Sequence, residues 1–194
     1  MEKIRRDKGK TFKIVSAAVL AAFWLSFLAV FAFSVVEKRM FPLYYECEVY
    51  SAADEYGIDR ALMLSVINVE SGFDPKAVSA KGAVGLMQIL PSTGRFIADR
   101  KGIEDYDLFD VGTNLDFGGY YLQYLSERFS GLRETAAAYN AGEGTVRKWL
   151  KNAEYSADGV TLDKIPYRET ETYVKKICES LKRYKKLYGK LLDK

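Results

Sequence analysis

The chain has 194 residues, which is enough for one domain of ordinary size and an additional segment. Its formal net charge of +3 is unevenly spread, because residues 1–36 carry six basic and two acidic side chains, whereas residues 37–194 carry 23 and 24. The larger part is therefore nearly neutral, which gives no electrostatic support to nucleic-acid binding. We expect no nucleic-acid partner.

The sequence contains no histidine, and its two cysteines are Cys47 and Cys178. This inventory excludes a Ser-His-Asp triad, a zinc-protease motif with histidine ligands and a histidine-activated cysteine nucleophile. Two cysteines also cannot form a four-thiolate metal site. We expect neither a metal nor another cofactor, so catalysis must rest mainly on carboxylates, amides, hydroxyls and lysines.

Residues 14–36 form an N-terminal stretch of 23 residues without a charged side chain. As a helix it is long enough to cross a hydrocarbon core about 30 Å thick. Basic residues precede it, which predicts a cytoplasmic N-terminus. We therefore expect a cytoplasmic tail (1–13), a single transmembrane anchor (14–36) and a linker (37–42), followed by an extracytoplasmic domain.

A cleaved signal peptide is the alternative interpretation of this segment. Ala32 and Ser34 are small residues at the spacing that a cleavage site requires. The apolar run is longer than the core of about 7–15 residues that is usual in signal peptides, which favours the uncleaved anchor. Because no cysteine lies near the end of the run, we do not expect a lipoprotein anchor.

The remaining part, residues 43–194, is predicted to be a single, mostly α domain. No alternating strand pattern longer than a few residues occurs, although residues 83–89 could form a small hairpin. Apolar spacing and helix-ending glycines predict helices over residues 43–56, 60–70, 92–100, 114–129, 134–140, 145–151 and 168–191.

Glu70 is the candidate catalytic residue. It lies in the last turn of the mostly apolar helix predicted between an Asp59 N-cap and Gly72, on the face of Met63 and Ile67. Burial and the negative end of the helix dipole both disfavour a charged carboxylate there. We therefore expect a raised pKa, which suits a general acid.

A turn-rich loop follows this helix and is predicted to fold back towards the acid. It contains Pro75, Gly82 and Gly85, and it ends on an apolar pair followed by an amide, Leu86-Met87-Gln88. This composition is typical of a pocket floor with one polar group.

Three motifs in order carry a family resemblance. The first comprises ESGF (70–73), PKAVS (75–79) and GAVGLMQ (82–88); the second is AAAYNAG (136–142) and the third IPYRETETYV (165–174). Together they resemble the soluble lytic transglycosylase domain, which is related to goose-type lysozyme. The resemblance spans most of residues 43–189 and implies a lysozyme-like fold.

The resemblance also implies an activity, namely cleavage of the β-1,4 bond between N-acetylmuramic acid and N-acetylglucosamine with formation of 1,6-anhydro ends. Glu70 would act as acid and then as base, and Ser71 would help to end its helix. A single carboxylate suffices for this reaction, although Asp74, Glu143 and Glu169 are candidates for a second one. The matching motif positions imply that substrate binding involves Ser79, Met87, Gln88, Tyr139, Asn140, Glu169 and Tyr173.

Three rival functions stay open from the sequence. A muramidase would hydrolyse the same bond, a non-catalytic scaffold would only bind the cell wall, and a chitin-directed relative would cut chitin oligomers. The expected partners are peptidoglycan glycan strands, the cytoplasmic membrane through residues 14–36 and a cell-envelope assembly, since no accessory wall-binding module is visible. We expect a monomer.

Two further features have alternative interpretations. Residues 175–194 carry eight basic and two acidic side chains, which form either the solvated face of a helix or a patch for anionic wall polymers or lipid headgroups. Cys47 and Cys178 either form a disulfide outside the membrane or remain two separate buried thiols.

Overall fold

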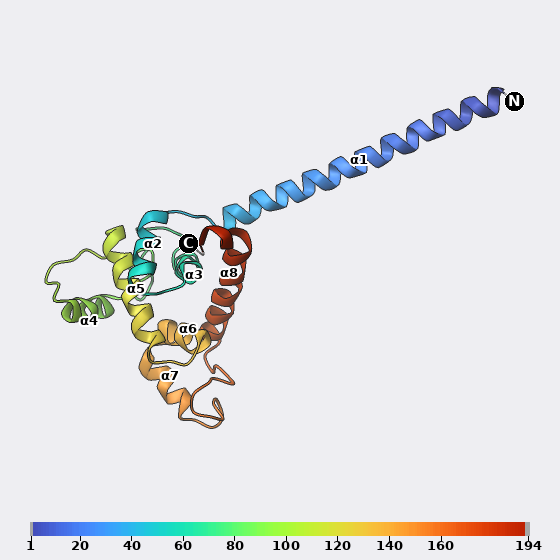
Figure 1. Ribbon diagram of the computed structural model, residues 1–194. Helices are drawn as coiled ribbons and strands as arrows, with labels where there is room; N and C mark the ends of the chain where they lie inside the picture. Colours follow the sequence, from blue (N-terminus) through green and yellow to red (C-terminus); the bar gives the residue numbers. More distant parts are fainter. Residues whose placement is uncertain (1, 193–194) are drawn as a thin grey trace. The chain divides into compact units, whose positions relative to one another are not determined.

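The computed structural model describes the backbone of residues 2–192 and the side chains of Ser16 and residues 19–192. Met1, Asp193, Lys194 and the charged side chains of the predicted N-terminal tail therefore lie outside the described residues. The chain divides into two compact units, Met1–Pro42 and Leu43–Lys194 (Figure 1).

The first unit contains one long helix, α1 (Glu2–Met40). Within it, Val19–Met40 is 22 residues long, and its most apolar stretch of 18 residues has a mean hydropathy of 2.5 and contains no buried residue. Ser26 and Ser34 donate their hydroxyls to the carbonyls of Ala22 and Phe31, at 2.9 and 2.8 Å, which satisfies these polar groups within the helix. By length and composition the helix is either a signal sequence or a membrane anchor.

The second unit is helical, and residues 43–192 contain only two isolated β-bridges, Val78 with Val84 and Val84 with Ile89. The prediction of a mostly α fold is confirmed, and the expected hairpin is reduced to these bridges. The helices are α2 (Glu46–Glu55), α3 (Arg60–Glu70), α4 (Pro91–Lys101), α5 (Val111–Ser126), α6 (Leu132–Ala141), α7 (Glu143–Leu150) and α8 (Arg168–Leu192).

Local backbone chemistry explains where the helix ends differ from the predicted ones. Helix α2 begins at Glu46 because Tyr45 adopts a left-handed conformation, with φ of 56°, that a helix cannot continue. Helix α5 begins at Val111, before the predicted start at residue 114, because the Asp110 side chain accepts a hydrogen bond from the Thr113 backbone N–H at 2.8 Å.

The core of this unit is centred on the packing of α3 against α8, which Figure 1 shows side by side. Helix α3 contributes the fully buried Met63, Leu64 and Ile67, and α8 contributes Val174 and Ile177. The buried residues of α8 recur at intervals of three and four, so one face of that helix is apolar and the other is solvated. Helix α6 also packs on α8.

Asn114 holds the loop that connects α3 to α4. Its side chain is 1% exposed. The amide oxygen accepts from the Met87 N–H at 2.8 Å, while the amide nitrogen donates to the Val84 and Leu108 carbonyls at 2.9 and 2.8 Å. Because this loop has almost no strand partners, these bonds satisfy backbone groups that would otherwise be buried unpaired.

Both cysteines are free thiols, so the proposed disulfide is not formed. The alternative of two buried thiols is also wrong for Cys47, which is exposed. Helix α2 buries Val49, Ala52 and Ala53, and Cys47 lies off that face. Cys178, in α8, is partly exposed.

Gly85 provides a test of the Asn114 contact. Its φ is +78°, and an added Cβ would overlap the Asn114 amide and approach the Leu108 carbonyl to 2.8 Å. Gly82 has a similar φ of +77°, with nothing within 4 Å. We expect Gly82→Ala to cost about 1 kcal/mol from backbone strain alone. Gly85→Ala should cost about 2–3 kcal/mol more, because of the clash.

Urea unfolding of both variants measures this difference. Equal losses of unfolding free energy in Gly82→Ala and Gly85→Ala would show that Asn114 does not constrain the loop.

Candidate active site

Glu70 is the last residue of α3, and the chain on both sides fixes its place. The Asp59 side chain caps the start of the helix by accepting hydrogen bonds from the N–H groups of Ala61 and Leu62. After the helix ends, the Ser71 hydroxyl donates to the Leu86 carbonyl at 2.8 Å. Ser71 therefore joins the end of the helix to the loop that Asn114 holds, as expected for a residue that helps to end the helix.

Glu70 and Tyr173 form the central polar contact of the site. The Tyr173 hydroxyl donates to Oε1 of Glu70 at 2.7 Å, which joins α8 to α3. Burial raises the pKa of Glu70 from 4.5 to about 7, although the hydrogen bond from Tyr173 acts in the opposite direction. Since Tyr173 donates its hydroxyl to Oε1, the proton of the carboxylic acid is assigned to Oε2.

Tyr139 of α6 interacts electrostatically with the same carboxyl group. Its own pKa is raised, first by burial and then by the negative charge of Glu70. The Tyr139 hydroxyl donates to the Met87 carbonyl at 2.8 Å rather than to Glu70. Tyr139 therefore contributes to the surroundings of the acid and also to the position of the loop.

Two pockets meet at Asn140. One has a volume of about 420 Å³ and contains Tyr173, and the other has a volume of about 200 Å³ and contains Tyr139 and Gln88. Asn140 lines both, and its side-chain oxygen accepts from the Thr170 hydroxyl at 2.8 Å. The tyrosines next to Glu70 thus each line one of two adjoining pockets.

Of the other residues expected to bind substrate, some line a pocket and some do not. Glu169 lines the larger pocket and its side chain is 73% exposed. Gln88 lines the smaller one, but its amide donates to the Ala77 and Gly85 carbonyls at 3.1 and 3.0 Å. Met87 is fully buried. Ser79 lines neither pocket, and its hydroxyl accepts from the Ala83 N–H at 3.0 Å.

The three candidates for a second acid differ from Glu70. Asp74 accepts from the Lys76 N–H at 2.9 Å, as in a polar turn. Burial alone would raise the pKa of Glu143, but hydrogen bonds from Arg147 and Tyr124 outweigh it and lower that pKa. Glu169 forms an exposed ion pair with Lys81 at 3.7 Å. Glu70 is the carboxyl group whose environment favours the protonated form.

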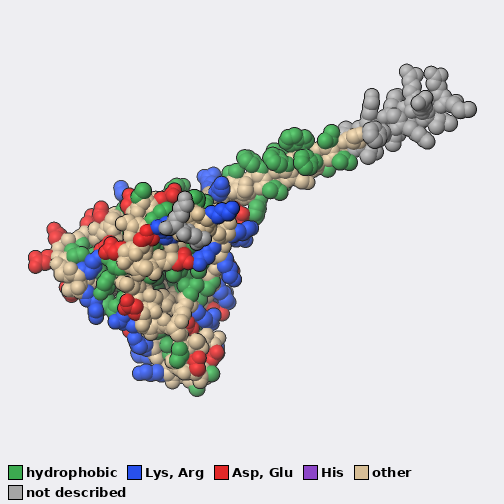
Figure 2. Space-filling view, in the orientation of Figure 1, with side chains coloured by type: hydrophobic (Ala, Val, Ile, Leu, Met, Phe, Trp, Pro, Cys, Tyr) green, Lys and Arg blue, Asp and Glu red, His purple; other side chains and the backbone are tan. Residues whose placement is uncertain are grey.

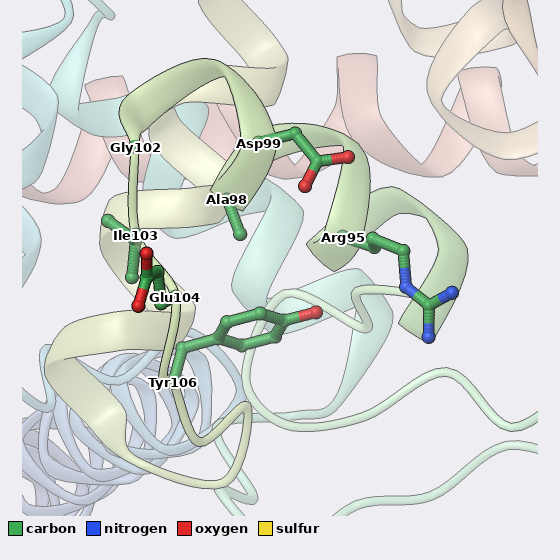
Figure 3. Close-up of a pocket in the computed structure, with 7 residues that line it drawn as sticks. All are labelled: Arg95, Ala98, Asp99, Gly102, Ile103, Glu104 and Tyr106. Atoms are coloured by element: carbon green, nitrogen blue, oxygen red, sulfur yellow. The ribbon is translucent and has the colours of Figure 1, made fainter.

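A third pocket, of about 560 Å³, lies beside α4 (Figure 3). It is lined by Arg95 and Asp99 of α4 and by Glu104 and Tyr106 of the following segment, and it shares no lining residue with the other two pockets. Its carboxylates are exposed, so it lacks a buried acid. We therefore place the candidate active site at the two pockets that meet at Asn140.

Several lining residues were not anticipated from the sequence. Tyr121 and Thr93 line the smaller pocket, and Arg168, Thr172 and Lys176 line the larger one. Thr172 directly precedes Tyr173 in the chain. Arg168 and Lys176 lie four residues before and four residues after Thr172. The helical spacing around the third motif could therefore have identified them.

Comparison with known proteins agrees with this geometry. The profile of the Transglycosylase SLT domain matches residues 49–160. The soluble lytic murein transglycosylase of Salmonella typhimurium is 36% identical over 79% of this chain and 25% of its own length. The membrane-bound lytic murein transglycosylase C of Actinobacillus pleuropneumoniae is 32% identical over 70% of this chain and 44% of its own length.

Solved structures show the same relationship. The 70 kDa soluble lytic transglycosylase of Escherichia coli superposes with a TM-score of 0.68 and 33% identity, over 77% of this chain and 25% of that one. The lytic transglycosylase Slt of Pseudomonas aeruginosa, solved as an inactive glutamate-to-glutamine mutant, gives a TM-score of 0.65 and 29% identity, over 76% of this chain and 25% of that one.

The chain spans between a quarter and a half of the length of these curated relatives. The matched profile covers more than half of the chain and includes Glu70. This chain therefore belongs to the Transglycosylase SLT domain family.

Proposed function

We propose that this protein is a peptidoglycan lytic transglycosylase, which cleaves the β-1,4 bond between N-acetylmuramic acid and N-acetylglucosamine and leaves 1,6-anhydro ends. The observation that carries the proposal is the carboxyl group of Glu70, whose pKa burial raises to about 7 and whose neighbours Tyr173 and Tyr139 each line a pocket. The relatives named lytic murein transglycosylases support it.

The geometry suits a reaction in which one carboxyl group serves twice. Glu70 first gives the proton on Oε2 to the bridging oxygen, and the bond to the anomeric carbon breaks. The resulting carboxylate then takes the proton of the muramic C6 hydroxyl, whose oxygen attacks the same anomeric carbon. The acid is regenerated and no water is consumed.

The surroundings of Glu70 fit both steps. Burial favours the acid form that the first step needs, whereas the Tyr173 hydrogen bond stabilises the carboxylate that this step produces. A pKa near the working pH leaves both forms accessible. A second carboxylate at the separations of about 5–9.5 Å used by ordinary glycosidases is not required.

Substrate binding is assigned to the residues around the two pockets. Asn140 lies where the pockets meet, Tyr173 and Glu169 line one of them, and Gln88 and Tyr139 line the other. Ser79 and the buried Met87 act through the shape of the loop between α3 and α4, which forms one wall of the site.

The N-terminal unit is assigned as an uncleaved anchor. The apolar helix and the membrane-bound relatives support residues 14–36 as the transmembrane segment, with residues 1–13 cytoplasmic, residues 37–42 as the linker and residues 43–194 as the catalytic domain outside the membrane. An assembly partner in the cell envelope would then add to localisation.

The products distinguish the proposed reaction from hydrolysis. Purified peptidoglycan digested with the full chain should release muropeptides that end in 1,6-anhydro sugars, each lighter by one water than the hydrolysis product. Mass spectrometry measures this difference. Hydrated ends would identify a muramidase, and the absence of any product would identify a wall-binding scaffold.

Glu70→Gln tests the acid. We expect a loss of at least about a hundredfold in turnover, because the transferable proton is removed while the shape is kept. The folded pKa of about 7 lies above the ordinary value of 4.5, so the native state loses stability as the pH rises through that window. At pH 8 the variant should therefore be more stable than the parent protein, by up to about 3 kcal/mol.

Turnover and urea unfolding of Glu70→Gln at pH 5 and pH 8 measure both effects. Retention of more than a tenth of the parental turnover would contradict the assignment of Glu70, whatever the stability of the variant.

Tyr173→Phe tests the hydrogen bond. The activity of the parent protein should fall as the pH rises past about 7, where Glu70 loses its proton. Removal of the Tyr173 hydroxyl takes away a contact that favours the carboxylate, so this fall should move to higher pH. Tyr139→Phe is the matched control, since its hydroxyl bonds to Met87 instead. An equal shift in both variants would contradict a direct role of Tyr173.

The anchor is tested by fractionation. The full-length protein, of 22.0 kDa, should stay in the membrane fraction after a carbonate wash. A mature N-terminus near Val35 would instead establish the signal peptide.

A further inference from the structure

One face of α8 borders the larger pocket with two cations. Arg168, Thr172 and Lys176 follow one another at intervals of four residues, so they lie on one face of the helix. Tyr173, the partner of Glu70, adjoins Thr172 and lines the same pocket. The two cationic side chains thus lie on either side of the part of α8 that reaches the acid.

Neither cation is neutralised within the described chain. No carboxylate of residues 37–192 lies within 4.0 Å of Arg168 or Lys176, and both side chains are exposed. Other α8 lysines do have partners, as Lys175 pairs with Glu171 at 2.9 Å and Lys185 with Asp59 at 2.5 Å. The two positive charges at the pocket are therefore not explained by ion pairing within the fold.

The one carboxylate on this border does not cancel them. Glu169 lines the pocket beside Arg168, but it pairs with Lys81 of the loop between α3 and α4, at 3.7 Å. With Lys81 included, the border carries three positive charges and one negative charge. Figure 2 shows Lys and Arg side chains gathered along the edge that α8 forms.

The chemistry of the proposed substrate supplies an anion. N-acetylated sugars are neutral, and the lactyl carboxyl of muramic acid is amide-linked where a peptide is attached, so the free carboxylates of a peptide-bearing strand belong to the peptide. A guanidinium group binds a carboxylate in a planar, two-bond geometry, and a lysine adds a point charge. A pocket of about 420 Å³ leaves room for such a substituent beside a sugar.

We propose that Arg168 and Lys176 bind the carboxylates of the peptide attached to the glycan strand, so that this pocket favours strands with free peptide carboxylates over uncharged strands. The inference rests on the proposed function, because it takes peptidoglycan as the substrate. It assigns the two residues a role in specificity and not in the bond cleavage itself.

Binding to the full chain carrying Glu70→Gln tests the proposal without turnover. The probes are glycan fragments of equal length, one with peptides and one with the peptides removed and the freed lactyl carboxyls converted to amides. In this background, Arg168→Gln combined with Lys176→Gln should weaken binding of the peptide-bearing fragment about three- to tenfold, since each exposed charge pair contributes little. Binding of the peptide-free fragment should be unchanged.

The matched control removes the same charge from the same helix. Lys182→Gln combined with Lys186→Gln changes two exposed lysines of α8 that line neither pocket, and it should leave both affinities unchanged. Higher salt should weaken binding of the peptide-bearing fragment in the Glu70→Gln chain and have less effect once Arg168 and Lys176 are replaced.

Three results would overturn the proposal. These are an equal loss for both fragments, no loss for either, or the same loss in the control pair. Failure of the proposed function is distinguishable, because it appears as the absence of anhydro products from the parent chain, whereas these affinities are measured without any reaction.

Discussion

The hydrogen bond from Tyr173 to Glu70 is the constraint on which the site depends. It joins residues 103 positions apart, and it is possible only because α3 and α8 pack against each other through the core of the second unit. Burial by that packing raises the pKa of the acid, and the tyrosine hydroxyl opposes the rise. The contact between α3 and α8 therefore determines both the position of the Glu70 carboxyl group and its pKa.

The loop between α3 and α4 shows how side chains replace missing secondary structure. Ser71, Asn114 and Tyr139 come from three different parts of the chain, and each bonds to the main chain of residues 84–87. Two isolated bridges alone would leave much of this buried backbone without partners. Met87, which resembles a cleft residue in the first motif, is fully buried and lines neither pocket.

The sequence predicted what depends on local chemistry. The apolar run before Glu70, the Asp59 cap and the turn after the helix are neighbours along the chain, so they indicated a buried acid at a helix end without knowledge of the fold. The contacts of Asn114 with Val84 and Met87 span 30 and 27 residues, and no local pattern encodes them. For the same reason the exposure of Cys47 could not be predicted, because it depends on which face of α2 meets α5.

The acid of the site, Glu70, and the two cations, Arg168 and Lys176, have different surroundings. Burial and the Tyr173 hydroxyl account for the shifted pKa of Glu70, and neither Arg168 nor Lys176 contributes to it. A cation in contact with the carboxyl group would lower its pKa and remove the acid form that the first step needs. Placed on the exposed face of α8, the two cations are screened by solvent from Glu70 yet remain within reach of a ligand in the pocket. An acid with a raised pKa at the end of α3 and a charged pocket border on α8 can therefore coexist in one site.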